Sequence, residues 1–217
     1  MEAAVRIAAR GRPDGLTGRA LGEELGADRS AVWRHFADKD GLLLAVGDRL
    51  LVMASGRVAE GLGPRQRLEA LARAVVDVFE AHPYVGAAIA CRTTRGPGEF
   101  ALVEMMLAAL GELGLQSRDV ARYQRMLADS VLAYAGMCAG YAVLPKQVQD
   151  ADERAWVREY SNADPKRYPA IAALAPQLAA TDDDMVLDTL LEAFWLAVDA
   201  RARNTAIPTP SQGGRRA

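Results

Sequence analysis

The chain has 217 residues, of which 51% are hydrophobic and 25% are charged, a composition typical of a folded globular protein rather than a disordered or fibrous one. The formal net charge is −2, so bulk charge gives no indication of a nucleic-acid partner, and any basic binding site has to be local. The early residues lack the pattern of a signal peptide, and no apolar run approaches the ~20 residues that span a bilayer. We therefore expect a soluble, cytoplasmic protein without membrane contact.

Apolar residues recur at intervals of three and four along the chain, which predicts an all-α fold. Gly and Pro clusters divide the chain into nine or ten helices joined by short connections. We expect a helix-turn-helix domain over residues 1–46, a helical ligand-binding and dimerisation domain over residues 47–204, and a flexible tail over residues 205–217. The tail is rich in Pro, Gly and polar residues and has no periodic apolar set.

The stretch from Leu16 to Asp40 carries the signals of three successive helix starts. Thr17 is placed to cap a helix that begins at Gly18, and Gly26 supplies the left-handed residue that ends it. Asp28 can cap a second helix only two residues later, and Asp38 can cap a long third one. Two short helices separated by a Gly-containing turn are the helix-turn-helix arrangement.

The second of these helices has a basic, aromatic outer face. Val32 and Phe36 are four residues apart and are expected to point inward together. The remaining positions from Arg29 to Arg34 then face outward or flank that face, and His35 and Lys39 lie at the far end. Each residue taken singly also fits a solvated face with Trp33 folded inward, but the combination of cap, Gly turn, cap and basic face favours a DNA-reading helix.

This pattern resembles the tetracycline-repressor (TetR) family of bacterial transcription regulators. The resemblance covers about residues 3 to 50, through EAAVRIAAR and LTGRALGEELGADRSAVWRHFADKDGLLLAV. It implies that Thr17, Trp33, His35 and Lys39 contact phosphates. It also implies that Arg29, Ser30, Ala31 and Arg34 face base edges, where arginine reads guanine. This chain departs from the family in carrying Trp33 where Tyr is commoner, so an indole N–H replaces a phenolic hydroxyl.

The C-terminal helices are expected to form a homodimer, because dimers of such proteins engage two half-sites of a pseudo-palindromic operator. The last helix is apolar around most of its circumference, and residues 118–143 carry a face of small residues that permits close helix packing. The family resemblance implies a four-helix bundle of these two helices from both subunits. The expected interface residues are Ala135, Ala139, Leu187, Leu191, Phe194, Trp195 and Val198.

The middle helices contain many Met and aromatic residues, which either fill a core or line a pocket for a small-molecule effector. The pocket hypothesis assigns His82 and Arg92 as polar anchors. Its other candidate ligand-binding residues are Phe79, Phe100, Met105, Met106, Tyr123, Met126, Tyr134, Met137 and Trp156.

The function expected is that of a sequence-specific DNA-binding transcriptional regulator, a repressor released from its operator by a small-molecule effector. An enzyme is disfavoured, because the chain has two histidines, no nucleophile elbow, no phosphate-binding Gly loop and no cluster of metal ligands. We therefore expect no catalytic residue, metal or cofactor. Cys91 and Cys138 lack a metal-binding spacing and are read as small buried side chains, with a redox-sensing thiol as the alternative. The alternative function is a helical ligand-binding or adaptor protein that does not bind DNA.

Overall fold

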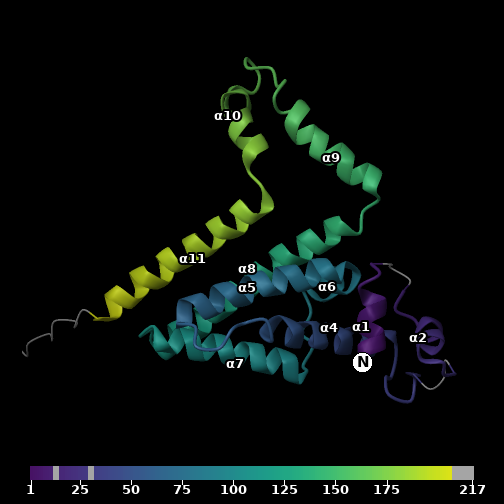
Figure 1. Ribbon diagram of the computed structural model, residues 1–217. Coiled ribbons are helices and arrows are strands. Elements are labelled where there is room, and N and C mark those ends of the chain that lie inside the picture. The colour runs from purple at the N-terminus through teal and green to yellow at the C-terminus, as the bar shows by residue number, and fades with distance from the viewer. Residues whose placement is uncertain (12–14, 29–31, 207–217) are drawn as a thin grey trace, which may run out of the picture.

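The first two helices of the chain pack against each other. A computed structural model of the protein describes residues 1–11, 15–28 and 32–206, and within these residues the chain forms ten helices and no strand. The expectation of an all-α fold is confirmed. Figure 1 shows α1 and α2 at one end of the molecule, next to the beginning of α4.

The helix boundaries near the N-terminus follow the predicted caps. Helix α1 spans Glu2–Ala8 and α2 spans Gly18–Leu25. The Thr17 hydroxyl accepts a hydrogen bond of 3.1 Å from the Ala20 N–H, and Gly26 takes a left-handed φ of 60°. Helix α4 spans Lys39–Ser55, and the Asp38 carboxylate accepts from the Gly41 N–H at 2.8 Å. These caps satisfy N–H groups that a helix end leaves without partners.

The helix expected after Asp28 starts in residues 29–31, which lie outside the described part of the chain. From Val32 onward the backbone turns, since the Val32 carbonyl accepts from the N–H groups of His35 and Phe36. Val32 is buried and Phe36 is half-buried, as their spacing predicts. Leu25, in the last turn of α2, is 58% exposed.

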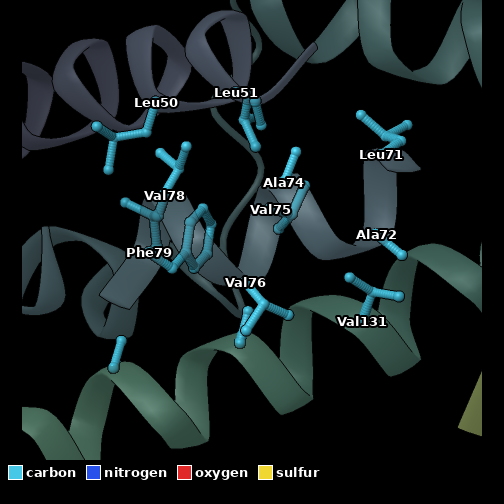
Figure 2. Close-up of a cluster of buried hydrophobic side chains, with 14 of the residues drawn as sticks. Leu50, Leu51, Leu71, Ala72, Ala74, Val75, Val76, Val78, Phe79 and Val131 are labelled. Atoms are coloured by element: carbon cyan, nitrogen blue, oxygen red, sulfur yellow. The ribbon is translucent and has the colours of Figure 1, made fainter. Parts of the chain in front are cut away.

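The core lies between α4, α5 and α8. Helix α5 spans Pro64–Ala81 and buries the predicted apolar stripe, from Leu68 to Phe79. Figure 2 shows its side chains meeting Leu50 and Leu51 of α4 on one side and Val131 of α8 on the other. Helix α4 therefore begins beside the N-terminal helices and ends inside the C-terminal core, crossing the domain boundary expected at residue 46.

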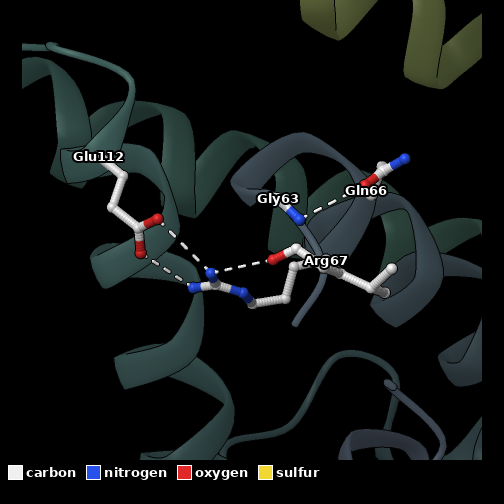
Figure 3. Close-up of polar contacts among 5 residues, drawn as sticks. Gly63, Gln66, Arg67 and Glu112 are labelled. Atoms are coloured by element: carbon white, nitrogen blue, oxygen red, sulfur yellow. Dashed lines mark hydrogen bonds and ion pairs between the residues drawn. The ribbon is translucent and has the colours of Figure 1, made fainter. Parts of the chain in front are cut away.

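Helices α6, α7 and α8 complete this core. They span Pro83–Ile89, Pro97–Glu112 and Ser117–Ala142. The start of α5 is fastened to the end of α7, because the Arg67 guanidinium donates to Glu112 at 3.0 Å and to the Leu62 carbonyl at 3.3 Å (Figure 3). In the same turn the Gln66 side chain accepts from the Gly63 N–H at 3.4 Å.

The remaining helices are α9 (Lys146–Arg158), α10 (Pro169–Ala180) and α11 (Asp183–Ala206). Figure 1 shows α9 and α10 standing apart from the helices around α5, while α11 runs back toward them. Helix α11 includes residues 205 and 206 of the expected tail, and residues 207–217 lie outside the described part. In the described residues no single helix is both long and apolar enough to cross a membrane, although α8 and α9, bent by 115°, meet that criterion together.

Candidate nucleic-acid interface and ligand cavity

Of the residues expected to contact DNA, the structure describes Thr17, at the start of α2, and four residues in the segment from Val32 to Lys39. Trp33, Arg34, His35 and Lys39 are all exposed, and Thr17 is half-buried at the start of α2. The Thr17 oxygen accepts from Ala20, so its own proton is still available to a further acceptor. Arg29, Ser30 and Ala31, the expected base-reading residues, lie outside the residues that the structure describes.

The cations of the N-terminal region divide into two groups. Arg6 and Arg10 both bind Glu24, at 3.0 and 2.6 Å, and Arg19 binds Glu23 at 2.9 Å. The hydrogen bonds from Arg6 and then from Arg10 hold the pKa of Glu24 below its usual range.

Arg34 and Lys39, in contrast, form no ion pair with any residue that the structure describes. These two cations are therefore available to an external anion, and a duplex presents phosphates at regular intervals.

Trp33 is 40% exposed and is not sealed inside the fold. The edge of its indole ring lies against Gly18, where a Cβ atom would stand 2.7 Å from Nε1. The side chain is therefore held at the first turn of α2, close to Thr17. The ring edge that carries Nε1 is covered by Gly18, which explains why an aromatic residue is tolerated on this exposed turn.

A cavity of about 690 Å³ lies within the C-terminal helices. Its walls come from α4, α5, α6, α7 and α8, and most are aliphatic, including Leu68, Val75, Leu102, Val131 and Leu132. Such a volume and lining are typical of sites for small organic ligands. The polar lining residues come from the segment Cys91–Thr94, from Glu99, and from Gln124, Arg125 and Asp129.

One cavity residue is tied directly to the first turn of α4. Arg92 binds Asp40 through two hydrogen bonds, of 3.0 and 2.8 Å, and this pairing lowers the pKa of the Asp40 carboxyl. Asp40 is adjacent to Lys39, one of the residues expected to contact phosphate. The mouth of the cavity and the candidate DNA-binding surface are thus connected by one bidentate ion pair.

A second connection is made by Asp48, a buried carboxylate in the middle of α4. Its oxygens accept from the N–H groups of Gly98 at 3.0 Å and Glu99 at 2.9 Å, in the first turn of α7. The Thr94 hydroxyl lies 3.0 Å from Asp48 Oδ1 and the same distance from Glu99. Asp48 thus caps α7 from another helix, and a Cβ at Gly96 would collide with its carboxylate. Sequence reasoning missed Asp48, although a lone acid among the apolar residues of α4 indicates a buried partner.

The structure brings only Arg92 and Met106 of the expected ligand-binding residues to this cavity. Phe79 is fully buried in the core, and His82 is buried with its Nδ1 2.8 Å from the Val78 carbonyl. The candidate set is corrected accordingly, because helical spacing does not distinguish core from cavity. The other residues of the set lie on exposed faces or in other contacts, namely Phe100, Met105, Tyr123, Met126, Tyr134, Met137 and Trp156.

The expected dimer residues stay a prediction. All seven are buried within the single chain, where they pack α8 and α11 into the fold: Ala135, Ala139, Leu187, Leu191, Phe194, Trp195 and Val198. The Tyr123 ring packs edge-on against Phe194 with centroids 6.0 Å apart, and the Arg65 guanidinium lies 4.6 Å from the Trp195 ring.

The opposite faces of the same helices are open. Leu196 is 64% exposed on α11, and Met137 is 59% exposed on α8. Met126 and Val186 extend this apolar surface along the two helices. We call the side chains of Met126, Met137, Val186 and Leu196 the outer α8/α11 face.

Comparison with known proteins agrees with this geometry. Residues 1–46 match the family "Bacterial regulatory proteins, tetR family", and residues 60–193 match "Tetracyclin repressor-like, C-terminal domain". The chain is 26% identical over 196 residues to the HTH-type transcriptional repressor DrrR1 of Streptomyces coeruleorubidus, covering 85% of this chain and 70% of that protein.

Solved structures of TetR regulators share the fold of this chain. The regulator SCO7222, a TetR from Streptomyces coelicolor, has a TM-score of 0.75 and 26% identity, over 93% of this chain and 96% of that one. ActR from the same organism, in complex with actinorhodin, shares the fold with a TM-score of 0.77 at 20% identity, over 92% of each chain. TetR regulators bind operator DNA and small-molecule effectors, form dimers and are generally not enzymes. This chain therefore belongs to the tetR family of bacterial DNA-binding transcriptional regulators.

Proposed function

We propose that the protein is a homodimeric repressor that binds a pseudo-palindromic operator and leaves it when a small molecule fills the cavity between α4 and α8. The observation that supports the DNA-binding surface is which cations of the N-terminal region form ion pairs within the protein and which do not. Carboxylates of the protein already bind Arg6, Arg10 and Arg19, whereas Arg34 and Lys39, beside Trp33, have no such partner in the described residues.

The contacts divide by chemistry. Thr17, Trp33, His35 and Lys39 contact phosphates and set the register of the protein on the duplex. Arg29, Ser30, Ala31 and Arg34 face base edges and determine which sequence is bound. Only the first group is expected to act equally on all DNA.

Two copies of the chain associate through the outer α8/α11 face. The four apolar side chains of this face are 41–64% exposed, and their removal from water would stabilise a dimer. The association places two DNA-binding surfaces on one molecule, as two half-sites about one helical turn apart require.

The effector is a largely apolar organic molecule with a few hydrogen-bonding groups. The aliphatic walls of the cavity favour an apolar body, and polar lining residues such as Arg92 and Arg125 would bind its polar groups. The repressor named DrrR1 and the actinorhodin complex of ActR are relatives whose names fit a regulator of this kind.

Ligand binding is coupled to DNA binding through α4. The cavity residues of segment 91–94 hold α4 at two places, through the Arg92–Asp40 pair and through Thr94 next to Asp48. A ligand that displaces this segment would rotate or shift the first turn of α4, which carries Lys39. The ligand acts only as far as it binds the two arrangements with different affinities.

The test compares Lys39→Ala and Arg29→Ala on a duplex that the wild-type protein selects from a random pool and on a random duplex. Lys39→Ala should weaken binding to both and, because each of the two subunits loses one phosphate contact, reduce the slope of log Kd against log salt by about two. Arg29→Ala should weaken binding to the selected duplex more than to the random one. Glu60→Ala, an exposed change in the loop after α4, is the control and should leave both affinities unchanged.

Two outcomes contradict the proposal. Equal specificity ratios for the Lys39 and Arg29 variants would show that the two residues do not divide phosphate from base contacts. Wild-type protein without salt-dependent DNA binding would favour the alternative of a ligand-binding or adaptor protein.

A further inference from the structure

Gly18 and Trp33 are in close contact, and neither helix capping nor core packing explains why these two residues are combined. Gly18 is the first residue of α2 and is buried. A Cβ atom on Gly18 would stand 2.7 Å from Trp33 Nε1 and 2.9 Å from both Cε2 and Cζ2. Side-chain atoms do not approach so closely, so the indole lies where it does because residue 18 has no side chain.

Backbone conformation does not explain this glycine. Gly18 is absent from the glycines of positive φ, which in the described residues are Gly11, Gly26, Gly61 and Gly114. Any residue could therefore adopt the backbone of Gly18 without strain. Because Gly18 has no side chain, it leaves space, and this space is filled by the edge of the Trp33 ring that carries the N–H group.

The Trp33 N–H group has no hydrogen-bond acceptor within the described part of the protein. The ring edge that carries it lies over Gly18, while 40% of the side chain as a whole is exposed. It lies beside Thr17, whose hydroxyl proton is free to donate, on the surface that bears Arg34 and Lys39. An indole N–H is a donor only, so its natural partner outside the protein is an acceptor such as a phosphate oxygen.

We infer that Gly18 is a positioning residue for DNA binding, which holds the Trp33 indole so that its N–H donates to one phosphate of the operator backbone. This inference rests on the proposed DNA-binding function and adds to it the reason that this chain combines a tryptophan with a glycine. Because the donor is uncharged and the acceptor carries no sequence information, the contact strengthens binding to all DNA without changing sequence preference.

The experiment is a double-mutant cycle with Gly18→Ala, Trp33→Phe and the combined variant, measured by fluorescence anisotropy on the selected and the random duplex. Trp33→Phe keeps an aromatic ring and removes the N–H. Each single change should weaken binding roughly a hundredfold on both duplexes, as expected when each of the two subunits loses one hydrogen bond to a charged group. The combined variant should be no more than about twofold weaker than either single one, because both changes remove the same contact.

Two further readouts separate this role from a structural one. The slope of log Kd against log salt should equal that of the wild type, unlike that of Lys39→Ala, because no cation is removed. Gly41→Ala is the matched control, since a Cβ there meets its nearest atom, Asp38 Oδ1, at an ordinary 3.5 Å. That variant should bind within about twofold of the wild type.

The outcomes are distinct. Wild-type protein that does not bind DNA overturns the proposed function itself. If the wild type binds, then wild-type affinity in Gly18→Ala, or losses that add up in the combined variant, overturns only the role of Gly18. Should Gly18→Ala lower the melting temperature, Trp33→Phe decides, because wild-type affinity in that variant excludes the N–H contact.

Discussion

Replacing Asp48 by alanine should destabilise the protein far more than replacing an exposed aspartate. The Asp48 carboxylate is only 8% exposed and accepts hydrogen bonds from Gly98 and Glu99 in the first turn of α7. Alanine removes both acceptors, and the geometry leaves these two N–H groups without a replacement from α4. Thr94 can still donate to Glu99, so the loss of its bond to Asp48 costs little.

The magnitude follows from these two N–H groups. A buried donor left without a partner costs about 1–3 kcal/mol, so the free energy of unfolding should fall by about 2–6 kcal/mol. For a chain of this size, 1 kcal/mol corresponds to about 2–4 °C, which predicts a fall in Tm on the order of 5–20 °C. Asp48→Asn keeps one acceptor oxygen and should lose roughly half as much.

The assay is thermal unfolding followed by far-UV circular dichroism at one fixed protein concentration, since a dimer melts at a concentration-dependent temperature. Asp77→Ala is the control, because the Asp77 carboxylate is exposed and lies 3.6 Å from Arg57. That control should change Tm by no more than about 2 °C. A Tm for Asp48→Ala as close to the wild type as the control would refute the claim that Asp48 holds α7 to α4.

Three further variants test the dimer, the cavity and the coupling. Leu196→Glu places a charge on the outer α8/α11 face, so light scattering at micromolar concentration should give a monomer mass, whereas a dimer would exclude Leu196 from the interface. Ala128→Trp fills part of the cavity, so compounds that raise the Tm of the wild type in a metabolite and antibiotic screen should no longer do so, while DNA affinity stays the same. An unchanged thermal shift would place the ligand elsewhere. Arg92→Ala removes the ion pair to Asp40, so the loss of DNA affinity caused by such a compound should shrink at least about twofold. If the compound lowers the DNA affinity of Arg92→Ala as much as that of the wild type, the Arg92–Asp40 ion pair does not couple the cavity to DNA binding.

The sequence alone predicts those features of the site that depend on neighbouring residues. Thr17, Gly26 and Asp38 end or begin helices as expected, because a cap involves atoms three or four positions apart. The exposure of Trp33 and Lys39 follows from the same local periodicity.

Features that depend on distant helices were predicted poorly. The small residues at 135–139 predict close helix packing, and within the chain Gly136 allows α8 to approach Ala90. Phe194 and Leu196 are both apolar residues of α11, and only the position of α8 determines that the first is buried and the second exposed. The cavity likewise depends on where five helices leave space, which no helical period encodes.

The contact between Asp48 and α7 joins residues 50 positions apart. In the sequence this contact is indicated only by the charge of Asp48 among the apolar residues of α4 and by Gly96 and Gly98, where a side chain would collide with Asp48. Patterns of this kind show that a buried carboxylate has a partner, but the partner is identified only when the helices are placed.

The account depends most directly on a dimer that presents two DNA-binding surfaces to one operator. Hydroxyl-radical footprinting of the selected duplex with wild-type protein measures this arrangement. We expect two equivalent protected regions whose centres are about one helical turn, ~34–36 Å, apart, and both should disappear together when a cavity-binding compound is added. A single protected region, or protection that the compound leaves unchanged, would contradict the account.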